Sequence, residues 1–449
     1  MTVSFFNLPR VDRSADAWEA RSLRSILTPR SERNRPDLPL LTVARERGVF
    51  VRSNEDANQN SIPEDLGKYK VARSGDLVVN KMKAWQGSLG LAPVDGIVSP
   101  AYFVFEADFD VPRFGEYLLR SKPYVAKFAA ASDGVRIGQW DLDIPRMRNI
   151  QVSLPQAEEQ AAIVRYLAHA NARIDKAIAA KCRLISLLDE LDRSVENGLA
   201  GSISSMASGG REISWLGALP YTWLVVPAKR LLKEVDRRSK TGREGLLSLR
   251  MREGLVDANE FTETPIPPED LVGYKIVHPG ELVMNRMRAS IGLFGVAKTT
   301  GLVSPDYSTM TVADGVDPHF YLHLFKTDLA MAEFRRRSNG LGTGSSGFMR
   351  LYYEDFGPIA LPLPPIEEQR RVVQDIQGQH TETLPIRSRA SREITLLQEF
   401  RARLVADVVT GQVDVRGIAA TLPDAPESFE NAVLTIDDEF QEVLSEGEN

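Results

Sequence analysis

The stretch that decides the fold is Leu154-Pro155-Gln156-Ala157-Glu158-Glu159-Gln160, and it returns 209 positions later as Leu363-Pro364-Pro365-Ile366-Glu367-Glu368-Gln369. A proline followed by acidic residues is typical of the first turn of a helix, because the helix dipole favours negative charge there. Apolar residues recur at helical spacing after each copy. The sequence therefore predicts two long helices, each preceded by a segment of mixed composition.

An apolar seam follows each of these starts, with positions alternately four and three residues apart. In the first helix the seam is Ile163, Leu167, Ala170, Ile174, Ala177, Lys181, Leu184, Leu188, Leu191 and Val195. In the second helix it is Val372, Ile376, Gln379, Thr383, Ile386, Ala390, Glu393, Leu397, Phe400 and Leu404. Such seams predict an antiparallel coiled coil, with a kink or break where Gly378 and Pro385 interrupt the second helix. The alternative, in which each helix packs only on its own domain, remains open.

The segments in front of the helices repeat each other at an offset of 205. Gly75-Asp76-Leu77-Val78-Val79-Asn80-Lys81-Met82-Lys83 returns as Gly280-Glu281-Leu282-Val283-Met284-Asn285-Arg286-Met287-Arg288. A period this long indicates duplication of a whole domain rather than a solenoid. Strands are predicted at Leu77–Asn80, Leu282–Asn285 and Tyr102–Phe105, and helical spacing covers Phe114–Phe128 and Phe320–Arg337.

The predicted fold class is therefore α/β, of mixed α+β character. Two duplicated globular domains are joined by two long antiparallel helices, with internal pseudo-twofold symmetry. The predicted boundaries are 1–155 for the first domain, 156–212 for the first long helix and a linker, 213–364 for the second domain, 365–416 for the second long helix, and 417–449 for an acidic, flexible tail.

The composition is that of a globular protein, and the charge distribution permits contact with DNA. Of the 449 residues, 43% are hydrophobic and 26% are charged. The net charge is −6, but nine acidic residues and no basic ones follow Arg416, so residues 1–416 carry −6 + 9 = +3. No apolar run approaches the roughly 20 residues of a membrane span. Because the single cysteine, Cys182, forms no internal disulfide, we expect a cytoplasmic protein.

No motif in the sequence indicates catalysis. His319 and His323 lie four residues apart but lack the His-Glu-x-x-His arrangement of a zinc site. The glycine-rich segment 340–347 follows a polar, helical stretch rather than an apolar strand, so it does not fit a dinucleotide-binding loop. The Asn-Pro-Pro-Tyr motif of adenine methyltransferases is absent. We therefore predict a non-catalytic protein with no cofactor and no metal.

Amide and cationic side chains follow the predicted strand in both domains. Lysine and arginine donate to guanine and to phosphates, whereas asparagine and glutamine pair with adenine. The alternative is an ordinary solvated loop that duplication has copied. The predicted DNA contacts are Asn80, Lys81, Lys83, Trp85, Gln86 and Arg136 in the first domain, and Asn285, Arg286, Arg288, Arg337, Ser345 and Arg350 in the second.

Three further stretches complete a recognisable order of motifs. They are Ile213-Ser214-Trp215-Leu216-Gly217-Ala218-Leu219-Pro220-x-x-Trp223, Leu396-Leu397-Gln398-Glu399-Phe400-Arg401, and Val409-Thr410-Gly411-Gln412-Val413-Asp414-Val415-Arg416. Together with the two repeated helix starts, this order resembles the specificity subunit of type I restriction–modification enzymes, over about residues 15–416.

The resemblance implies a function and a set of partners. Each globular domain would be a target-recognition domain that reads one half of a bipartite double-stranded DNA sequence, and the paired helices would fix the spacing between the halves. Two modification (methyltransferase) subunits would dock on the helical regions and hold the methyl donor, and restriction/translocase subunits would use ATP and magnesium. No membrane is implied. The candidate partner contacts are Glu158, Glu159, Gln160, Glu367, Glu368 and Gln369, whose alternative role is to start the helices. A non-catalytic protein–protein scaffold with no direct role at DNA is the competing hypothesis.

Overall fold

The computed structural model describes residues 18–45, 47–52, 66–134, 140–205, 211–260, 266–340 and 349–423. These residues form two compact units. The first unit runs to Lys181 and resumes at Arg392, and the second runs from Cys182 to Ser391. Each unit holds one globular domain and one segment of each long helix, α5 (Ala157–Ser205) and α10 (Ile366–Val409). Both long helices predicted from the sequence are confirmed.

The first domain is organised around a four-stranded antiparallel sheet in the order β2-β9-β6-β7. Four separate two-stranded sheets, β1-β12, β3-β4, β5-β8 and β10-β11, belong to the same domain. Its elements are β1 (Glu19–Ser22), α1 (Leu23–Ile26), β2 (Leu27–Pro29), β3 (Leu41–Ala44), β4 (Gly48–Val51), β5 (Lys70–Ala72), β6 (Leu77–Asn80), η2 (Ala84–Gln86), β7 (Leu89–Leu91), β8 (Gly96–Val98), β9 (Tyr102–Ala107), α2 (Pro112–Arg120), α3 (Lys122–Ala130), β10 (Ser132–Asp133), β11 (Asp141–Leu142), α4 (Ile144–Arg148) and β12 (Gln151–Leu154).

The second domain repeats this architecture, with a four-stranded antiparallel sheet in the order β16-β23-β20-β21. Pairs β15-β24, β17-β18 and β19-β22 match those of the first domain. Its elements are β13 (Arg211–Ile213), β14 (Gly217–Leu219), β15 (Leu224–Pro227), α6 (Ala228–Leu231), β16 (Leu232–Val235), β17 (Leu247–Arg250), β18 (Gly254–Asp257), η3 (Ala258–Glu260), η4 (Pro268–Leu271), β19 (Lys275–Val277), β20 (Leu282–Asn285), η5 (Ala289–Ile291), β21 (Phe294–Val296), β22 (Gly301–Val303), β23 (Tyr307–Val312), α7 (Pro318–Phe325), α8 (Asp328–Arg337), α9 (Tyr353–Phe356) and β24 (Ala360–Leu363). The duplication is confirmed as a duplication of structure.

The three predicted strands are confirmed, but each predicted domain helix is two helices. The helical spacing over 114–128 is divided between α2 and α3 at Ser121, and that over 320–337 between α7 and α8. Thr327 shows the physical reason, because its hydroxyl accepts a hydrogen bond from the backbone N–H of Ala330 and so starts a new helix. Apolar periodicity continues across such a cap, which is why the sequence pattern alone conceals it.

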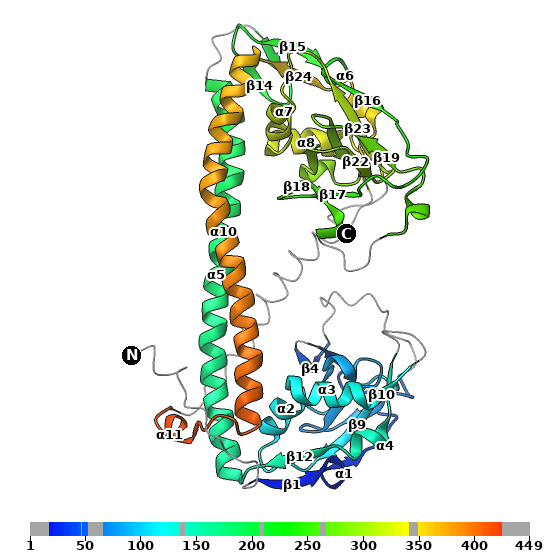
Figure 1. Ribbon diagram of the computed structural model, residues 1–449, viewed down its shortest axis with the longest axis vertical. Coiled ribbons are helices and arrows are strands. Elements are labelled where there is room, and N and C mark those ends of the chain that lie inside the picture. The colour runs from blue at the N-terminus through cyan, green and yellow to red at the C-terminus, as the bar shows by residue number, and fades with distance from the viewer. Residues whose placement is uncertain are drawn as a thin grey trace. The chain divides into compact units, whose positions relative to one another are not determined.

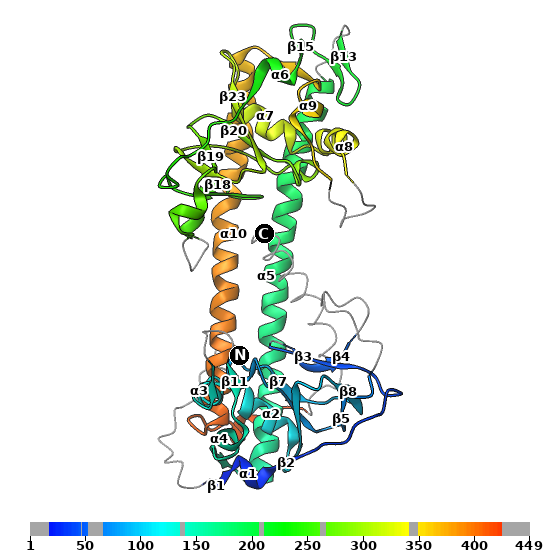
Figure 2. The same cartoon turned by 90° about the vertical axis from the view of Figure 1, so that its right-hand side faces the viewer.

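Within each unit, a segment of α5 and a segment of α10 lie side by side and run in opposite directions (Figures 1 and 2). Ion pairs occur between the facing helices. In the first unit Lys181 pairs with Glu393 at 2.6 Å and Arg401 pairs with Asp175. In the second unit Arg387 pairs with both Asp189 and Asp192, at 2.9 and 2.7 Å. The predicted antiparallel pairing is confirmed within each unit.

The sequence predicted a strict heptad for the seam of α5, but the buried positions depart from it. Beyond Ile174, Ile178 and Ile185 are buried rather than the predicted Ala177 and Leu184, whereas the predicted Leu188 is buried and the predicted Leu191 is 50% exposed. The reason is the helical pitch: 3.6 residues per turn drift against a seven-residue repeat, so positions next to the predicted ones, Ile178 and Ile185, enter the buried stripe alongside Leu188. In α10, Ile386 (47% exposed) and Phe400 (37% exposed) likewise face outward.

Helix α10 is continuous through Pro385, so of the predicted kink or break, the break does not occur. A proline removes one N–H and crowds the preceding turn, which destabilises a helix interior. Interhelical contacts hold the chain on both sides of it. Thr383 donates to Asp192 at 3.3 Å, and Arg387 pairs with that same carboxylate. The tertiary contacts therefore override the local preference for a break.

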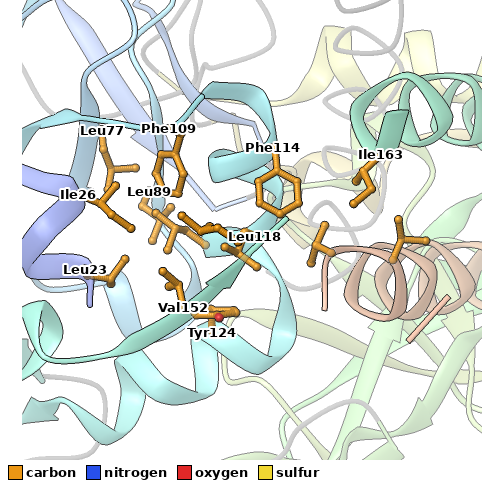
Figure 3. Close-up of a cluster of buried hydrophobic side chains, with 14 of the residues drawn as sticks. Leu23, Ile26, Leu77, Leu89, Phe109, Phe114, Leu118, Tyr124, Val152 and Ile163 are labelled. Atoms are coloured by element: carbon orange, nitrogen blue, oxygen red, sulfur yellow. The ribbon is translucent and has the colours of Figure 1, made fainter. Parts of the chain in front are cut away.

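The core of each unit combines three parts of the chain. In the first unit, Leu23, Leu77 and Phe114 pack with Ile163 near the start of α5 (Figure 3), and the cluster extends to Val408 near the end of α10. In the second unit, the start of α10 contributes Val373 and Ile376 in the same way, and the end of α5 contributes Leu199 and Ile203. Each domain is thus completed by its own helix and by the end of the other domain's helix.

Candidate nucleic-acid interface

Two equivalent turns follow the central strands β6 and β20 and carry six of the twelve predicted DNA contacts. We call residues 81–87 the first turn and residues 286–292 the second turn. In each, a 3-10 helix, η2 or η5, is closed by a glycine with positive φ, 90° at Gly87 and 80° at Gly292. Only glycine adopts this conformation without strain. The backbone path is therefore the same in both domains.

The asparagines at the start of these turns serve the backbone. The Asn80 side-chain oxygen accepts a hydrogen bond from the N–H of Met82 at 3.2 Å. The Asn285 oxygen accepts from the N–H groups of Met287 and Arg288, at 3.0 and 3.2 Å, and this side chain is buried. These contacts are the local Asx geometry that asparagine favours at turns. As DNA contacts, Asn80 and Asn285 stay predictions, and the described structure gives both of them a structural role.

The first cation of each turn is held by an acidic partner. Lys81 pairs with Asp141 at 2.5 Å. Arg286 donates to Ser308 at 2.9 Å and to Glu234 at 3.0 Å. Each cation is therefore fixed in direction, and its charge is partly neutralised.

Each turn also meets a segment that is far away in the sequence. The N–H of Leu142 donates to the carbonyl of Lys81 at 3.1 Å, and the N–H of Leu351 donates to the carbonyl of Arg286 at 2.9 Å. This pairing brings Arg350 to the second turn, where its guanidinium lies 3.9 Å from the Met287 sulfur and 3.8 Å from Asp306. Two of the predicted DNA contacts, Arg286 and Arg350, therefore lie in the same part of the second domain.

Aromatic residues flank the first turn. The indole N–H of Trp85 donates to the carbonyl of Met82 at 3.0 Å, and its ring lies 5.3 Å from that of Trp140. Gln86 is half-buried and Lys83 is exposed. Sequence reasoning missed Trp140 and Asp141, because only the tertiary pairing of β11 with the turn brings them there.

The remaining predicted contacts are more scattered. Arg337 ends α8 and donates to Glu333 at 2.6 Å, beside Arg336, which donates to the same carboxylate at 2.8 Å. The hydrogen bond from Arg336 is the main cause that lowers the pKa of Glu333. Arg136 and Ser345 lie outside the described residues.

Sequence reasoning also missed a pair of equivalent lysines beneath the turns. Lys70 donates to the carbonyl of Tyr102 at 2.5 Å, and Lys275 donates to that of Tyr307 at 2.7 Å. Burial lowers the pKa of both lysines. The signal that would have found them is their recurrence at the offset of 205. Because Tyr102 and Tyr307 are register partners of Asn80 and Asn285, these lysines support the strands from which the turns emerge.

The candidate partner contacts at the helix starts divide into buried and exposed groups. Gln160 and Gln369 are fully buried. Each donates to a proline carbonyl five residues earlier, and each accepts a backbone N–H from its domain, that of Val111 or Asp317. They fasten the helix start to the domain and present no surface to another subunit. Glu368 accepts from the indole of Trp223 at 2.6 Å, and Glu159 lies 4.0 Å from Arg416. Glu158 and Glu367 are exposed, so a partner role there stays a prediction.

The described residues contain no cluster of three metal-ligating side chains. Within the same ranges, no helix is long and apolar enough to cross a membrane. The acidic segment from residue 424 onward lies outside the described residues, so the predicted flexible tail stays a prediction.

Comparison with solved structures places the fold. One chain, from a structure described as the structural basis of complex assembly and conformational transition of the type I R-M system, has a TM-score of 0.56 and 17% identity. The match covers 91% of this protein and 100% of that chain. The protein therefore shares its fold, over nearly its whole described length, with a component of a type I R-M system.

Two other chains match at lower TM-scores and carry no part of the argument. They are the HsdS subunit from Thermoanaerobacter tengcongensis (TM-score 0.40, 16% identity, covering 92% of this protein and all of that chain) and the type I restriction-modification system S subunit from M. genitalium (0.33, 13%, 89% and 98%). No protein-family model matches the sequence.

Proposed function

We propose that this protein is the DNA-specificity subunit of a type I restriction–modification complex. Each domain reads one half of a bipartite target. The observation that carries the proposal is the recurrence, in two separately folded domains, of a turn that is held by an asparagine and that places cationic side chains after the central strand. The fold shared with a type I R-M component supports it.

The chain itself performs no chemistry in this proposal. Its domains supply the position and the sequence preference, and the partner subunits supply the reaction. Two methyltransferase subunits would hold the methyl donor, and restriction subunits would hold ATP and magnesium. Lys83 and the guanidinium of Arg350 are suited to phosphate contacts, which fix register on the duplex and make binding depend on salt.

The competing hypothesis is a protein–protein scaffold with no direct role at DNA. The internal ion pairs of Lys81 and Arg286 favour it, because a cation already paired with an acid gains less from a phosphate. The two hypotheses differ in salt dependence. A specificity subunit loses DNA affinity steeply as salt rises, whereas a scaffold shows no specific binding at any salt concentration.

The test is a map of modified bases. The chain is expressed with its neighbouring methyltransferase in a host that lacks adenine methylation, and the methylated positions are sequenced. We expect one two-part motif with a fixed gap, which disappears when this chain is omitted. An active methyltransferase whose pattern ignores the chain contradicts the proposal. Selection of bound duplexes from a random pool by the purified complex gives an independent readout.

A further inference from the structure

An exposed methionine occupies the same position in each turn, and Ile291 of the second turn is also exposed, at 48%. Met82 is 53% exposed and Met287 is 39% exposed, at positions that match at the offset of 205. The asparagine two residues earlier bonds to the backbone of the turn, as described above. The turn therefore presents an apolar group where the sequence pattern suggested an amide.

The backbone that presents these methionines is held in one conformation. In the first turn, the N–H of Met82 is held by Asn80 and its carbonyl accepts from Trp85. In the second turn, the N–H of Met287 is held by Asn285. Because the backbone of the turn is already ordered, binding has to order only the methionine side chain, which favours a specific contact over a loose one.

Cations stand on both sides of each methionine in the sequence. Lys81 and Lys83 flank Met82, and Arg286 and Arg288 flank Met287. In the second turn, the Arg350 guanidinium lies 3.9 Å from the methionine sulfur. An apolar tip between cations fits a DNA groove, where phosphates line the edges and the base edges lie between them.

We propose that Met82 and Met287 are specificity-determining residues, each contacting the 5-methyl group of a thymine in its own half of the target. The inference rests on the proposed function and names the chemistry of that same site. The thymine methyl is the apolar group that the major groove presents. Methionine, flexible and polarisable, suits such a contact.

The test combines a base analogue with single substitutions. Each thymine of the established target is replaced in turn by uracil, which lacks only the methyl group. The complex of the full chain with its methyltransferase is then titrated with each duplex. For the unaltered protein, we expect uracil at one position in each half-site to weaken binding about fourfold, the effect of one buried methyl group.

The variants assign each effect to one residue. Met82→Ala should abolish the uracil effect in one half-site and leave the other intact, and Met287→Ala should do the reverse. Met82→Gln and Met287→Gln, which keep the length but not the apolar character, should behave like the alanine variants. Val94→Ala and Met251→Ala are matched controls, because both residues are exposed apolar side chains outside the turns, at 41% and 40%.

Two outcomes overturn the inference. In one, the unaltered complex binds all uracil duplexes as tightly as the thymine duplex. In the other, the methionine variants keep the full uracil effect. In both, the bipartite motif of the unaltered complex still stands, so the proposed function survives. If the unaltered complex shows no sequence preference at all, the proposed function itself fails.

Discussion

The two domains have one fold but different cores. In the second domain, Phe294, Phe325, Phe334 and Phe356 form a cluster whose ring centroids lie 5.0 to 6.4 Å apart. The position of Phe294 is taken in the first domain by Leu89, which is also fully buried. Equal topology with unequal side chains shows that the strand order depends on the apolar pattern rather than on particular residues.

The turns differ in the same way. Arg286 takes its acidic partner from strand β16, through Glu234, whereas Lys81 takes its partner from β11, through Asp141. The counterpart of Glu234 in the first domain is Pro29, which has no carboxylate to pair with Lys81. The position of the cation is thus retained while the acid that orients it has moved. The common part of the site is its backbone, and the divergent part is the set of charges around it.

The largest expected effect tests the difference between the cores. Phe294→Ala should lower the free energy of unfolding of the second unit by about 4 kcal/mol, and Leu89→Ala that of the first unit by about 3 kcal/mol. Phenylalanine is the larger of the two side chains, so its removal leaves the larger cavity. Hydrogen exchange followed separately in peptides of each unit measures both. Equal losses in both units after either substitution would show that the two cores unfold together.

The next effect concerns the ion pairs between the helices. Arg387→Ala leaves Asp189 and Asp192, which are about three-quarters buried, without this partner, and should cost about 2 kcal/mol. Arg401→Ala removes only the pair with Asp175 in the first unit and should cost about 1 kcal/mol. Denaturant unfolding monitored by helix content measures the two losses.

The control for these variants is Arg403→Ala, whose side chain is 69% exposed and pairs with Asp407 within one helix. It should change stability by no more than about 0.5 kcal/mol. If all three arginine variants lose the same amount, the interhelical position of Arg387 and Arg401 is irrelevant to stability.

A smaller effect should be the same in both domains. Gly75 and Gly280 have φ values of 87° and 81°, and an added Cβ meets nothing within 4 Å at either position. Substitution by alanine should therefore cost about 1 kcal/mol at each, from backbone strain alone. Gly245→Ala, with equal space and no positive φ, should cost nothing measurable. Unequal losses at Gly75 and Gly280 would contradict the equivalence of the two turns that they precede.

The smallest expected effect is a pH dependence of stability in the second unit. Burial lowers the pKa of His380, and nearby His323 and Lys326 act in the same direction, against Asp192 and Glu196. A histidine with a lowered folded pKa stabilises the fold fully above its unfolded pKa of about 6.5 and loses that contribution as pH falls below it. Amide protection around His380 in the second unit should therefore decline below that pH.

His380→Gln should make this decline shallower, because the group that titrates has been removed. Burial also lowers the pKa of His319, so part of the decline should persist in the variant. An unchanged slope in the variant would assign the whole decline to other groups. Hydrogen exchange at pH values from 7.5 down to 5 measures it.

The sequence predicted the features that depend on local patterns. Repetition at 205 and 209 identified two copies of one domain, and the β-type runs before Asn80 and Asn285 placed the central strands correctly. Proline followed by acids marked the beginnings of both long helices. These features could be predicted because backbone preferences and apolar periodicity act between near neighbours in the chain.

Other features depend on residues that meet only in the folded chain. Gln160 and Gln369 read as surface groups, yet they are fully buried because each pairs with the backbone of its own domain. Arg350 reaches the second turn through a backbone hydrogen bond from Leu351 to Arg286. By itself, the sequence determined the duplicated layout and the long helices. The tertiary structure decided which side chains of the turns are exposed, because long-range hydrogen bonds and ion pairs decide which polar groups are satisfied internally.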